Sequence, residues 1–487
     1  MGDTTLRPFD SFAVLLRDTT SGPLVTAETL LVSGTIGVFL ALAFLFVAIG
    51  SRRSPGWWLG AILHGAAGVT LPFTTNIFTF FVVWEFVTIG AGILLTQEPG
   101  PRRLLKHYLP LQLFAAAALL AAFALHYAAA GTASLGAGGG GISGGPVAAA
   151  LALCAVGIKA AIIPFHIWMT RTYPQVRPAT TVVLSAVATK IGVFGIYRLV
   201  PAGMAIEVLG GIMAVVGVIY ALRQHRLRLF LAFHVISQIG YMTAGVGSLS
   251  LAAQAGGLYH LAGNVVYKGM LFMVAAGLIR LAGHDDIYRM NGIGRTRPWL
   301  LVAGLIGSLA ISGVPPFNGY ISKHALELSL HSEVAVWLLT VAGIGTAASF
   351  SKFMWHSFLK QASASERRPA PGGREIVMIV LAAACLFAGL APQILFPALP
   401  PGARVTVSSF TTGLIAPGAG IVLFAFGYRY LQPYLERLPS VTVLTQPAYT
   451  SVCRLLAALQ RPHTGEIRRY LGWILFGLVV LWSAAIL

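Results

Sequence analysis

Long apolar stretches constrain this chain of 487 residues more than any other feature of its sequence. Stretches of about 18 or more apolar residues, enough to cross a bilayer core of roughly 30 Å as a helix, recur from one end to the other. Only 10% of the residues are charged, against about 25% in an average soluble domain. The pattern predicts an all-α polytopic membrane protein with about fourteen transmembrane helices. Their expected positions are 28–50, 57–75, 76–96, 107–130, 147–169, 179–200, 205–223, 228–248, 253–282, 299–329, 333–360, 375–396, 406–431 and 469–487.

Basic residues outside these stretches fall almost entirely into alternate connections. Counting from the connection at 51–56, 24 Lys and Arg lie on one side, and only Arg7, Arg17, Arg198 and Arg404 lie on the other. Cytoplasmic loops of membrane proteins carry such an excess. We therefore expect a multi-pass protein of the cytoplasmic (inner) membrane with both termini on the outer face. The bias accounts for the net charge of +18 without a nucleic-acid partner.

Several classes of site are excluded by what the sequence lacks. Cys154, Cys385 and Cys453 are far apart and form no C-x-x-C pair, so neither a disulfide framework, a zinc site nor an iron–sulfur cluster is supported. No glycine-rich nucleotide-binding motif occurs in a suitable context. The first 27 residues lack the continuous apolar core of a signal peptide. We predict no metal, no cofactor and no catalytic or redox centre in this chain.

The few lysines are concentrated where charge is least expected. Five of the seven lie inside apolar stretches, whereas arginine stays in the connections. A buried lysine can lose its proton, but an arginine stays charged, so the segregation suits proton binding and release. Each lysine costs about 2.5 to 3.5 kcal/mol at the bilayer centre, which favours a polar interior. The alternative for each, and above all for Lys352 near a basic end, is a side chain that snorkels to the surface. The five are Lys159, Lys190, Lys268, Lys323 and Lys352.

One carboxylate belongs with these lysines. Glu85 is the only acid in the middle of a long apolar stretch, and a lysine from a neighbouring helix is its expected partner. Movement of the glutamate away from the lysine would favour release of the lysine's proton, which is a proton switch. The alternative is a static ion pair, which is a weak source of stability.

Helix-breaking residues accompany two of the lysines. Lys159 precedes Pro164 in KAAIIPFHIW, and Lys323 follows Pro315 and Pro316 in SGVPPFNGYISK. Proline within a span frees backbone carbonyls, which is tolerated where protein or water satisfies them. A broken helix with an ionisable residue in each half predicts a transporter built from two repeats. We expect an N-terminal segment at 1–27, leading helices at 28–75, repeat regions at 76–223 and 224–396, and C-terminal helices at 397–487 with a polar cytoplasmic-side segment at 432–468.

Histidines extend the series of ionisable residues. His260, Asn264 and Lys268 recur at intervals of four and share one helix face, as do His234 and Gln238. Such stripes are either hydrogen-bonding contacts between helices or a proton relay. We favour the relay.

Five segments together resemble a known family. In order and spacing, TNIFTFFVVWEF, KAAIIPFHIW with ATKIGVFGIYRL, SQIGYM, YHLAGNVVYKGMLF and SGVPPFNGYISK resemble the antiporter-like membrane subunits shared by respiratory complex I, membrane-bound group 4 hydrogenases and multi-subunit (Mrp-type) sodium/proton antiporters. The match covers roughly residues 10–360. The resemblance implies two inverted five-helix repeats with broken helices, and a central axis of charged residues that carries protons.

Roles follow from the resemblance residue by residue. Glu85 is similar to the family's glutamate and Lys159 to the lysine it pairs with, whereas Lys190 resembles the bridging lysine. His260 matches the histidine of the H-x-x-x-[HN] helix, and Lys323 matches the terminal lysine. His234 and Lys268 join this proton-translocation set, and Gln238, Asn264 and Lys352 are further candidates.

The sequence also departs from the family pattern. Two helices that usually precede this region are missing, so the chain looks N-terminally shortened. Asn264 stands where many relatives have a second histidine, which weakens an uninterrupted histidine relay. Asn76 is often aspartate in relatives, which affects access to Glu85.

Three functions are compatible with these features. The first is a proton-translocating, or sodium/proton-translocating, subunit of a hetero-oligomeric membrane complex embedded in the lipid bilayer. The second is an energy-coupling subunit that supplies proton flux to a bicarbonate or CO2 accumulation complex. The third is a membrane scaffold without transport, against which the intact set of Glu85, Lys159, Lys190 and Lys323 argues.

Overall fold

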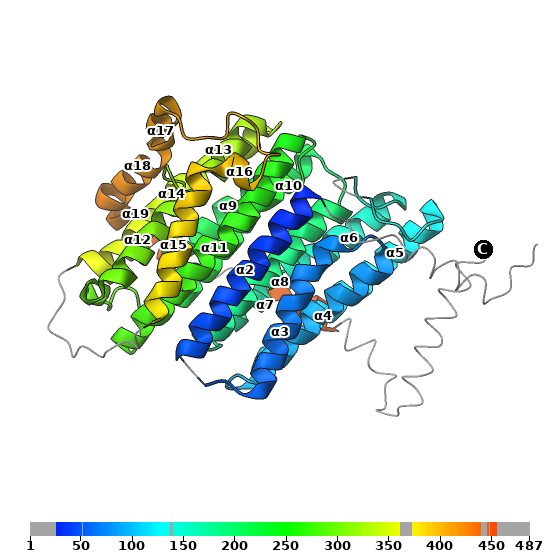
Figure 1. Ribbon diagram of the computed structural model, residues 1–487, viewed down its shortest axis with the longest axis horizontal. Coiled ribbons are helices and arrows are strands. Elements are labelled where there is room, and N and C mark those ends of the chain that lie inside the picture. Colours follow the sequence, from blue (N-terminus) through cyan, green and yellow to red (C-terminus); the bar gives the residue numbers. More distant parts are fainter. Residues whose placement is uncertain are drawn as a thin grey trace, which may run out of the picture.

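The fold is a layer of inclined, closely packed helices (Figure 1). The computed structural model describes residues 26–50, 52–136, 140–360, 373–439, 446–447 and 449–454. Within these ranges there is no strand beyond two isolated bridges. Nine of the helices described there are long and apolar enough to cross a membrane. The predicted all-α polytopic membrane fold is confirmed, whereas the expected span at 469–487 lies outside the described residues.

The predicted spans of the first half match observed helices closely. The span expected at 57–75 ends early, because its α-helix stops at Thr70 and a short 3-10 turn follows, and the span expected at 147–169 is divided into two helices, Gly145–Ala160 and Ile167–Thr172. The helices are α2 (Ala27–Gly50), α3 (Pro55–Thr70), α4 (Ile77–Thr96), α5 (Pro101–Ala130), α6 (Gly145–Ala160), α7 (Ile167–Thr172) and α8 (Pro178–Leu199).

The second half repeats this series and then adds shorter pieces. The span expected at 406–431 is interrupted, because it consists of α17, α18, a π-helical turn and α19. The helices are α9 (Met204–Arg223), α10 (Leu227–Val246), α11 (Leu251–Ala282), α12 (Pro298–Ser312), α13 (Asn318–Ser329), α14 (Glu333–Met354), α15 (Arg374–Leu390), α16 (Pro392–Leu395), α17 (Val407–Gly413), α18 (Ile415–Val422) and α19 (Tyr428–Arg437).

Both predicted helix breaks are present, and side chains satisfy the carbonyls that they free. The first break separates α6 from α7 around Pro164, and the indole of Trp168 donates to the Ile158 carbonyl at 2.7 Å. The second separates α12 from α13, and the Lys323 ammonium donates to the Ile311 carbonyl at 2.9 Å. Each break therefore exposes polar backbone inside the protein rather than to lipid.

The order of helices is the same in the two halves. Helices α3 to α8 and α9 to α14 each consist of two helices, a long helix, a broken helix and a further helix. The packing repeats as well: α3 packs on α4 as α9 packs on α10, and α6 packs on α8 as α12 packs on α14. Because each unit crosses the membrane five times, the second unit enters from the opposite side. The two repeats are therefore inverted relative to each other.

Hydrogen bonds between connections sort them into two faces. For example, the Arg177 amide donates to Glu98 at 2.7 Å, and the Gly203 amide donates to the Gly247 carbonyl at 2.8 Å. We call the arginine-rich side the basic face; its connections are 52–54, 97–100, 173–177, 224–226 and 283–297. The other side is the opposite face, with connections 74–76, 131–136, 140–144, 200–203, 247–250 and 330–332.

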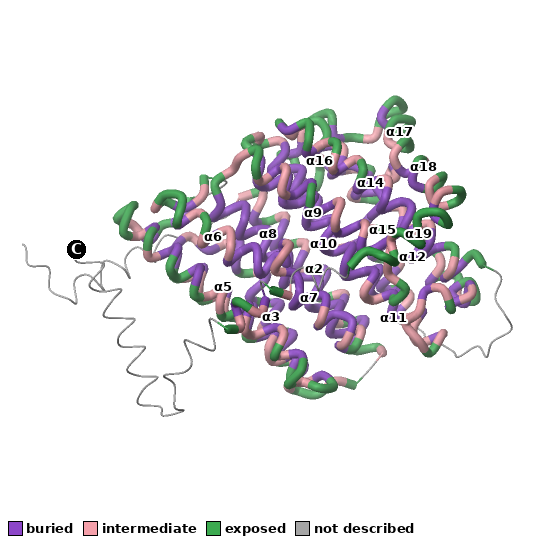
Figure 2. Tube along the Cα trace, turned by 180° about the vertical axis from the view of Figure 1, so that it is seen from behind, coloured by how far each residue is buried: buried purple, intermediate pink, exposed green. Residues whose placement is uncertain are grey.

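Burial is deepest along the middle of the layer. Helices α8, α10 and α11 bury nearly all their residues (Figure 2). Helices α2, α4 and α5 bury one side and present apolar residues on the other. A helix that is buried on all sides has no side in contact with lipid. Ionisable residues on α8, α10 and α11 are therefore surrounded by protein rather than by lipid.

Candidate functional site

Lys159 lies at the first helix break, at the end of α6. It is buried, and its ammonium donates to the Thr88 hydroxyl at 2.6 Å and to the Trp84 carbonyl at 3.2 Å. The ammonium also lies 4.3 Å from the centre of the Trp84 ring. Both partners belong to α4, which α5 separates from α6 in the sequence. The contact therefore joins two helices that the sequence does not place together.

Glu85 is next to these partners but does not contact the lysine directly. It lies on α4 between Trp84 and Thr88, is half-buried, and its Oε1 atom has no partner among the described residues. No direct ion pair joins Glu85 to Lys159 in the part of the chain that the structure describes, although the two charges attract each other. The predicted pair is thus a pair of neighbours, because Lys159 reaches one turn further along α4. Asn76 caps this helix by accepting from the Thr79 amide at 2.9 Å.

Lys190 and Lys268 occupy the centre of the molecule. Both are fully buried, on α8 and α11, and neither ammonium has a hydrogen-bond partner among the described residues. Their charges repel each other. The Lys268 ammonium lies 5.8 Å from the ring centre of Phe272, one turn further along α11. The helices that carry them, α8 of the first repeat and α11 of the second, pack against each other.

A hydrogen-bond network surrounds His260 on α11. One ring nitrogen is 2.7 Å from the Ser322 hydroxyl, and the other is 3.1 Å from the Gln238 side-chain oxygen. The Tyr267 hydroxyl lies within 3.3 Å of both His260 and Gln238, and the Asn264 amide donates to it at 3.2 Å. The structure thus brings the predicted His260, Gln238 and Asn264 together. Tyr267 and Ser322 complete the network.

His234 belongs to a separate contact on α10. Its Nε2 atom is 2.7 Å from the Ser349 hydroxyl of α14, and its ring packs against Phe230 and Phe350. The Ser349 hydroxyl donates in turn to the Thr346 carbonyl. His234 and Gln238 share a helix face as expected, but no hydrogen bond joins them within the described residues.

Lys323 lies at the second helix break. Besides its bond to the Ile311 carbonyl, its ammonium is 4.7 Å from the ring centre of Tyr241, which stacks on His260. Glu327, an acid one turn further along α13, lies 3.7 Å from His324 and forms no ion pair with Lys323 within the described residues. Lys323 therefore connects the His260 network to the break rather than to a carboxylate.

Lys352 does not snorkel. It is fully buried at the basic end of α14, and it donates to the carbonyls of Leu222 at 2.6 Å and Gln224 at 3.0 Å. The rings of Phe230, Tyr288 and Tyr428 surround the ammonium at 5.6 to 5.7 Å. The end of α9 and these rings cover the lysine, which explains why its side chain does not reach solvent.

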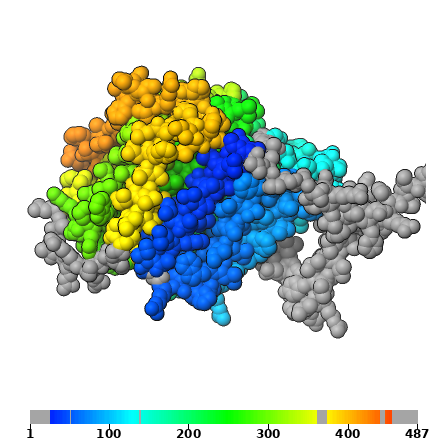
Figure 3. Space-filling view, viewed as in Figure 1, coloured from blue at the N-terminus to red at the C-terminus, as the bar shows by residue number. Residues whose placement is uncertain are grey.

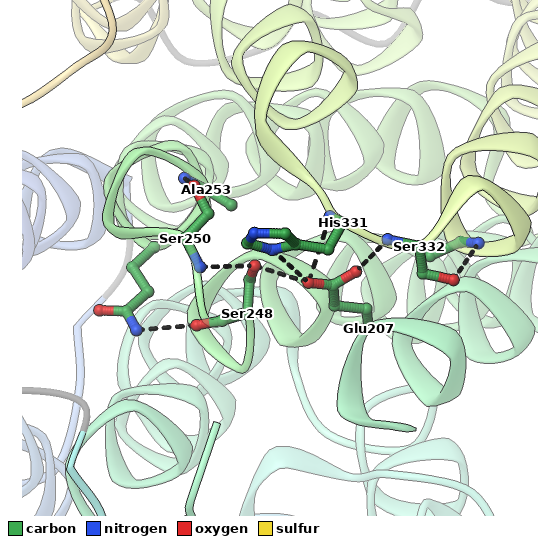
Figure 4. Close-up of polar contacts among 8 residues, drawn as sticks. Glu207, Ser248, Ser250, Ala253, His331 and Ser332 are labelled. Atoms are coloured by element: carbon green, nitrogen blue, oxygen red, sulfur yellow. Dashed lines mark hydrogen bonds and ion pairs between the residues drawn. The ribbon is translucent and has the colours of Figure 1, made fainter. Parts of the chain in front are cut away.

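Glu207, a buried acid, was not singled out from the sequence, because it is near a helix end. Glu207, at the start of α9, is fully buried; it accepts from the Ser248 hydroxyl at 2.6 Å and the Ser332 amide at 2.7 Å (Figure 4). His331 lies 3.7 Å from the same carboxylate. Glu207 joins three connections of the opposite face, so its contacts are those of a structural tie.

The hydroxyl partners of the buried lysines and histidines were missed for a similar reason. Thr88, Ser322 and Ser349 are residues that occur commonly in apolar helices. Only Thr88 could have been found from the sequence, because its spacing of three from Glu85 places both on one helix face. No group of His, Cys, Asp or Glu in the described ranges could hold a metal ion. The arrangement is thus a series of buried ionisable side chains, most of which have hydroxyl or carbonyl partners.

Comparisons with known proteins identify what the chain is similar to. The model of a family described as "NADH:quinone oxidoreductase/Mrp antiporter, TM" matches residues 74–350, more than half of the chain. A Na(+)/H(+) antiporter subunit of Alkalihalophilus pseudofirmus is 28% identical over 75% of this chain and 79% of that protein. "Hydrogenase-4 component B" of Escherichia coli is 28% identical over 65% of this chain and 52% of that protein. A chain of the Mrp complex from Dietzia sp. superposes with a TM-score of 0.69 at 22% identity, covering 85% of this chain and 86% of that one.

Proposed function

The chain belongs to the NADH:quinone oxidoreductase/Mrp antiporter transmembrane family, and from this premise we propose that it moves protons through its buried axis as one subunit of a larger membrane complex. The relatives named above are a subunit of a cation/proton antiporter and a component of a hydrogenase, which supports a cation/proton-translocating subunit. The proposed axis consists of Glu85, Lys159, Lys190, Lys268, His234, His260 and Lys323, with Gln238, Asn264 and Lys352 beside it.

One observation carries the proposal: five buried lysines lie without a direct ion pair to any carboxylate among the described residues. Ionisable residues within the membrane are costly and usually mark ion pathways. A structural role would favour fixed ion pairs, because an unpaired buried charge is destabilising. Four of the lysines, all but Lys190, have carbonyls, a hydroxyl or aromatic rings as neighbours, which can accompany either protonation state.

The contacts favour a stepwise transfer. A proton that neutralises Glu85 removes the negative charge nearest Lys159, so Lys159 can release its own proton toward the centre. Lys190 and Lys268 repel each other, so a proton on one promotes release from the other. The His260 network then leads to Lys323 through Ser322 and the stacked Tyr241 ring. The two ends of this path lie at the two helix breaks.

The chemistry of the axis favours protons over sodium. Hard cations are held by several carboxylate, carbonyl or water oxygens. The axis instead consists mainly of amines and imidazoles and has one carboxylate, Glu85. The test is proton uptake by proteoliposomes that contain the assembled complex, with sodium present or replaced by choline. Uptake that persists in choline supports the proposal, and uptake that stops without sodium contradicts it.

We also propose that the basic face is cytoplasmic, because positively charged connections are retained on that side. In a variant without the three native cysteines, Arg102→Cys should react with a membrane-impermeant thiol reagent only from the cytoplasm. Leu249→Cys, in a connection of the opposite face, should react only from outside. Both positions are exposed in the structure. Labelling of Arg102→Cys from outside would overturn the orientation.

Two finer predictions concern the domain boundaries and the inorganic-carbon role. We propose that the chain is divided into leading helices, two repeats and C-terminal helices. The helix order suggests repeats at 55–199 and 204–359, a shift from the sequence-based boundaries. The inorganic-carbon role is tested by purifying the complex and identifying its subunits, since a zinc-dependent carbonic-anhydrase-like partner would support that role over the first.

A further inference from the structure

A cavity lined by arginines opens at the basic face, where α2 and α11 end and α15 begins. Its volume is about 220 Å³, and Arg53, Arg280 and Arg374 line it together with Phe46 and Val47. A smaller cavity beside it shares Arg280, Arg374 and Phe46 and adds Arg297. None of these arginines belongs to the proton axis. The charge gathered here needs a separate explanation.

Two carboxylates lie near these arginines among the described residues: Glu375 lines the smaller cavity, and Glu98 acts on Arg53. Arg53, Arg280 and Arg374 take part in no ion pair within the described ranges, and the Nε atoms of Arg53 and Arg374 are buried there without a partner. Glu98, the carboxylate that acts on Arg53, is already bonded to the Arg177 amide and the Thr180 hydroxyl. Burial lowers the pKa of the Arg53 guanidinium from its usual value, Glu98 raises it and Arg177 lowers it further.

The position of Arg374 is fixed by its neighbours. It is buried, its guanidinium carbon lies 5.0 Å from the ring centre of Phe46, and it occupies the space where a Cβ atom on Gly50 would lie. The first residue of α15 is thus held against the last turn of α2. Arg280 approaches the same cavity from α11. The arginines are therefore preorganised around one space rather than spread over a surface.

The residues around the cavity suit a bound lipid. Helices α2 and α15 lie side by side, and their surfaces adjoin in Figure 3. Both present large apolar side chains outward near their basic ends: Leu45 and Ile49 on α2, and Ile376 and Val380 on α15. The cavity lies where the helices end, which is the level of lipid headgroups in a bilayer.

We propose that this pocket binds the phosphate of an anionic phospholipid, with the acyl chains lying along the apolar surfaces of α2 and α15. Guanidinium groups bind phosphate through paired, charge-assisted hydrogen bonds. Basic pockets between membrane helices on the cytoplasmic side are typical sites for anionic headgroups. The inference depends on the membrane orientation of the fold and not on which ion the axis carries.

The test compares lipids and variants on the purified, delipidated complex. Binding is measured by native mass spectrometry and by the shift in unfolding temperature on adding dioleoylphosphatidylglycerol, dioleoylphosphatidylcholine or inorganic phosphate. We expect phosphatidylglycerol to bind the wild type and the exposed control Arg289→Gln equally. Arg280→Gln and Arg374→Gln should each bind it about tenfold more weakly.

Several outcomes would overturn the proposal. Equal retention of phosphatidylglycerol by all variants would show that the arginines hold no headgroup. Inorganic phosphate that binds as tightly as the lipid would assign the pocket to a free anion. Unfolding temperatures in phosphatidylcholine separate lost binding from lost folding. If Arg374→Gln unfolds there, Arg280→Gln and Arg374→Lys decide, with the charge-conserving variant expected to keep most of the binding.

Discussion

Replacing Glu85 by glutamine is expected to abolish proton translocation, with a loss on the order of 100-fold. The amide keeps the size of the side chain but cannot take up or release a proton. Lys159 would keep its contacts with Thr88 and Trp84, so the helices should stay in place. Glu85→Asp should retain part of the activity. The measurement is the initial rate of proton uptake by proteoliposomes that contain the assembled complex.

Because no direct ion pair joins Glu85 to Lys159 in the described residues, this test separates lost transport from lost stability. Removing one partner of a tight buried pair typically destabilises a protein by about 3 to 5 kcal/mol. Because Glu85 holds no such bond here, the yield of assembled complex should be close to that of the wild type. Glu333→Gln, an exposed acid at the start of α14, is the matched control and should transport normally. Normal transport by the Glu85 variant would remove the proposed switch.

Lys323→Arg is expected to stop translocation as completely as Lys323→Ala. A guanidinium can still donate to the Ile311 carbonyl and lie against Tyr241, but it does not release its proton at any physiological pH. The conservative variant therefore separates charge from proton exchange. Both variants are measured in the same proteoliposome assay, with assembly checked by the subunit composition of the purified complex.

The matched control for Lys323 is Glu327→Gln. Glu327 is half-exposed and pairs with His324, so a path that ends at Lys323 should tolerate its loss. If Lys323→Arg transports at the wild-type rate, Lys323 is a structural charge that fills the helix break. The outlet would then have to be sought at Lys352, the other buried lysine near a carbonyl cluster in the second repeat.

Part of this site could be predicted because residues that are energetically costly inside a membrane stand out in the sequence. A lysine or glutamate inside an apolar stretch, and a proline beside it, are visible without a structure, as Glu85, Lys159 and Pro164 illustrate. The alternation of arginine-rich connections likewise predicted two faces that the hydrogen bonds between connections then define. These are local signals, and the fold preserves them.

Contacts between distant helices could not be predicted in this way. Thr88 and Lys159 are 71 residues apart, and Lys352 reaches carbonyls 130 and 128 residues earlier in the chain. Whether a lysine near a helix end reaches solvent depends on what covers it, which is why Lys352 is buried despite its position. The register of α6 against α4 also placed Lys159 beside Thr88 instead of directly against Glu85.

The most direct test of a continuous proton path is Lys190→Ala, because this fully buried lysine lies on α8, the helix of the first repeat that packs on α11 of the second. Its ammonium has no hydrogen-bond partner among the described residues, so removing it should leave the assembly intact. Ser185→Ala is the control, because this serine lies on the same helix and its hydroxyl donates to the nearby Val182 carbonyl. In proteoliposomes the control should take up protons at the wild-type rate while Lys190→Ala takes up none above the leak. Wild-type uptake by an assembled Lys190→Ala complex would contradict the account.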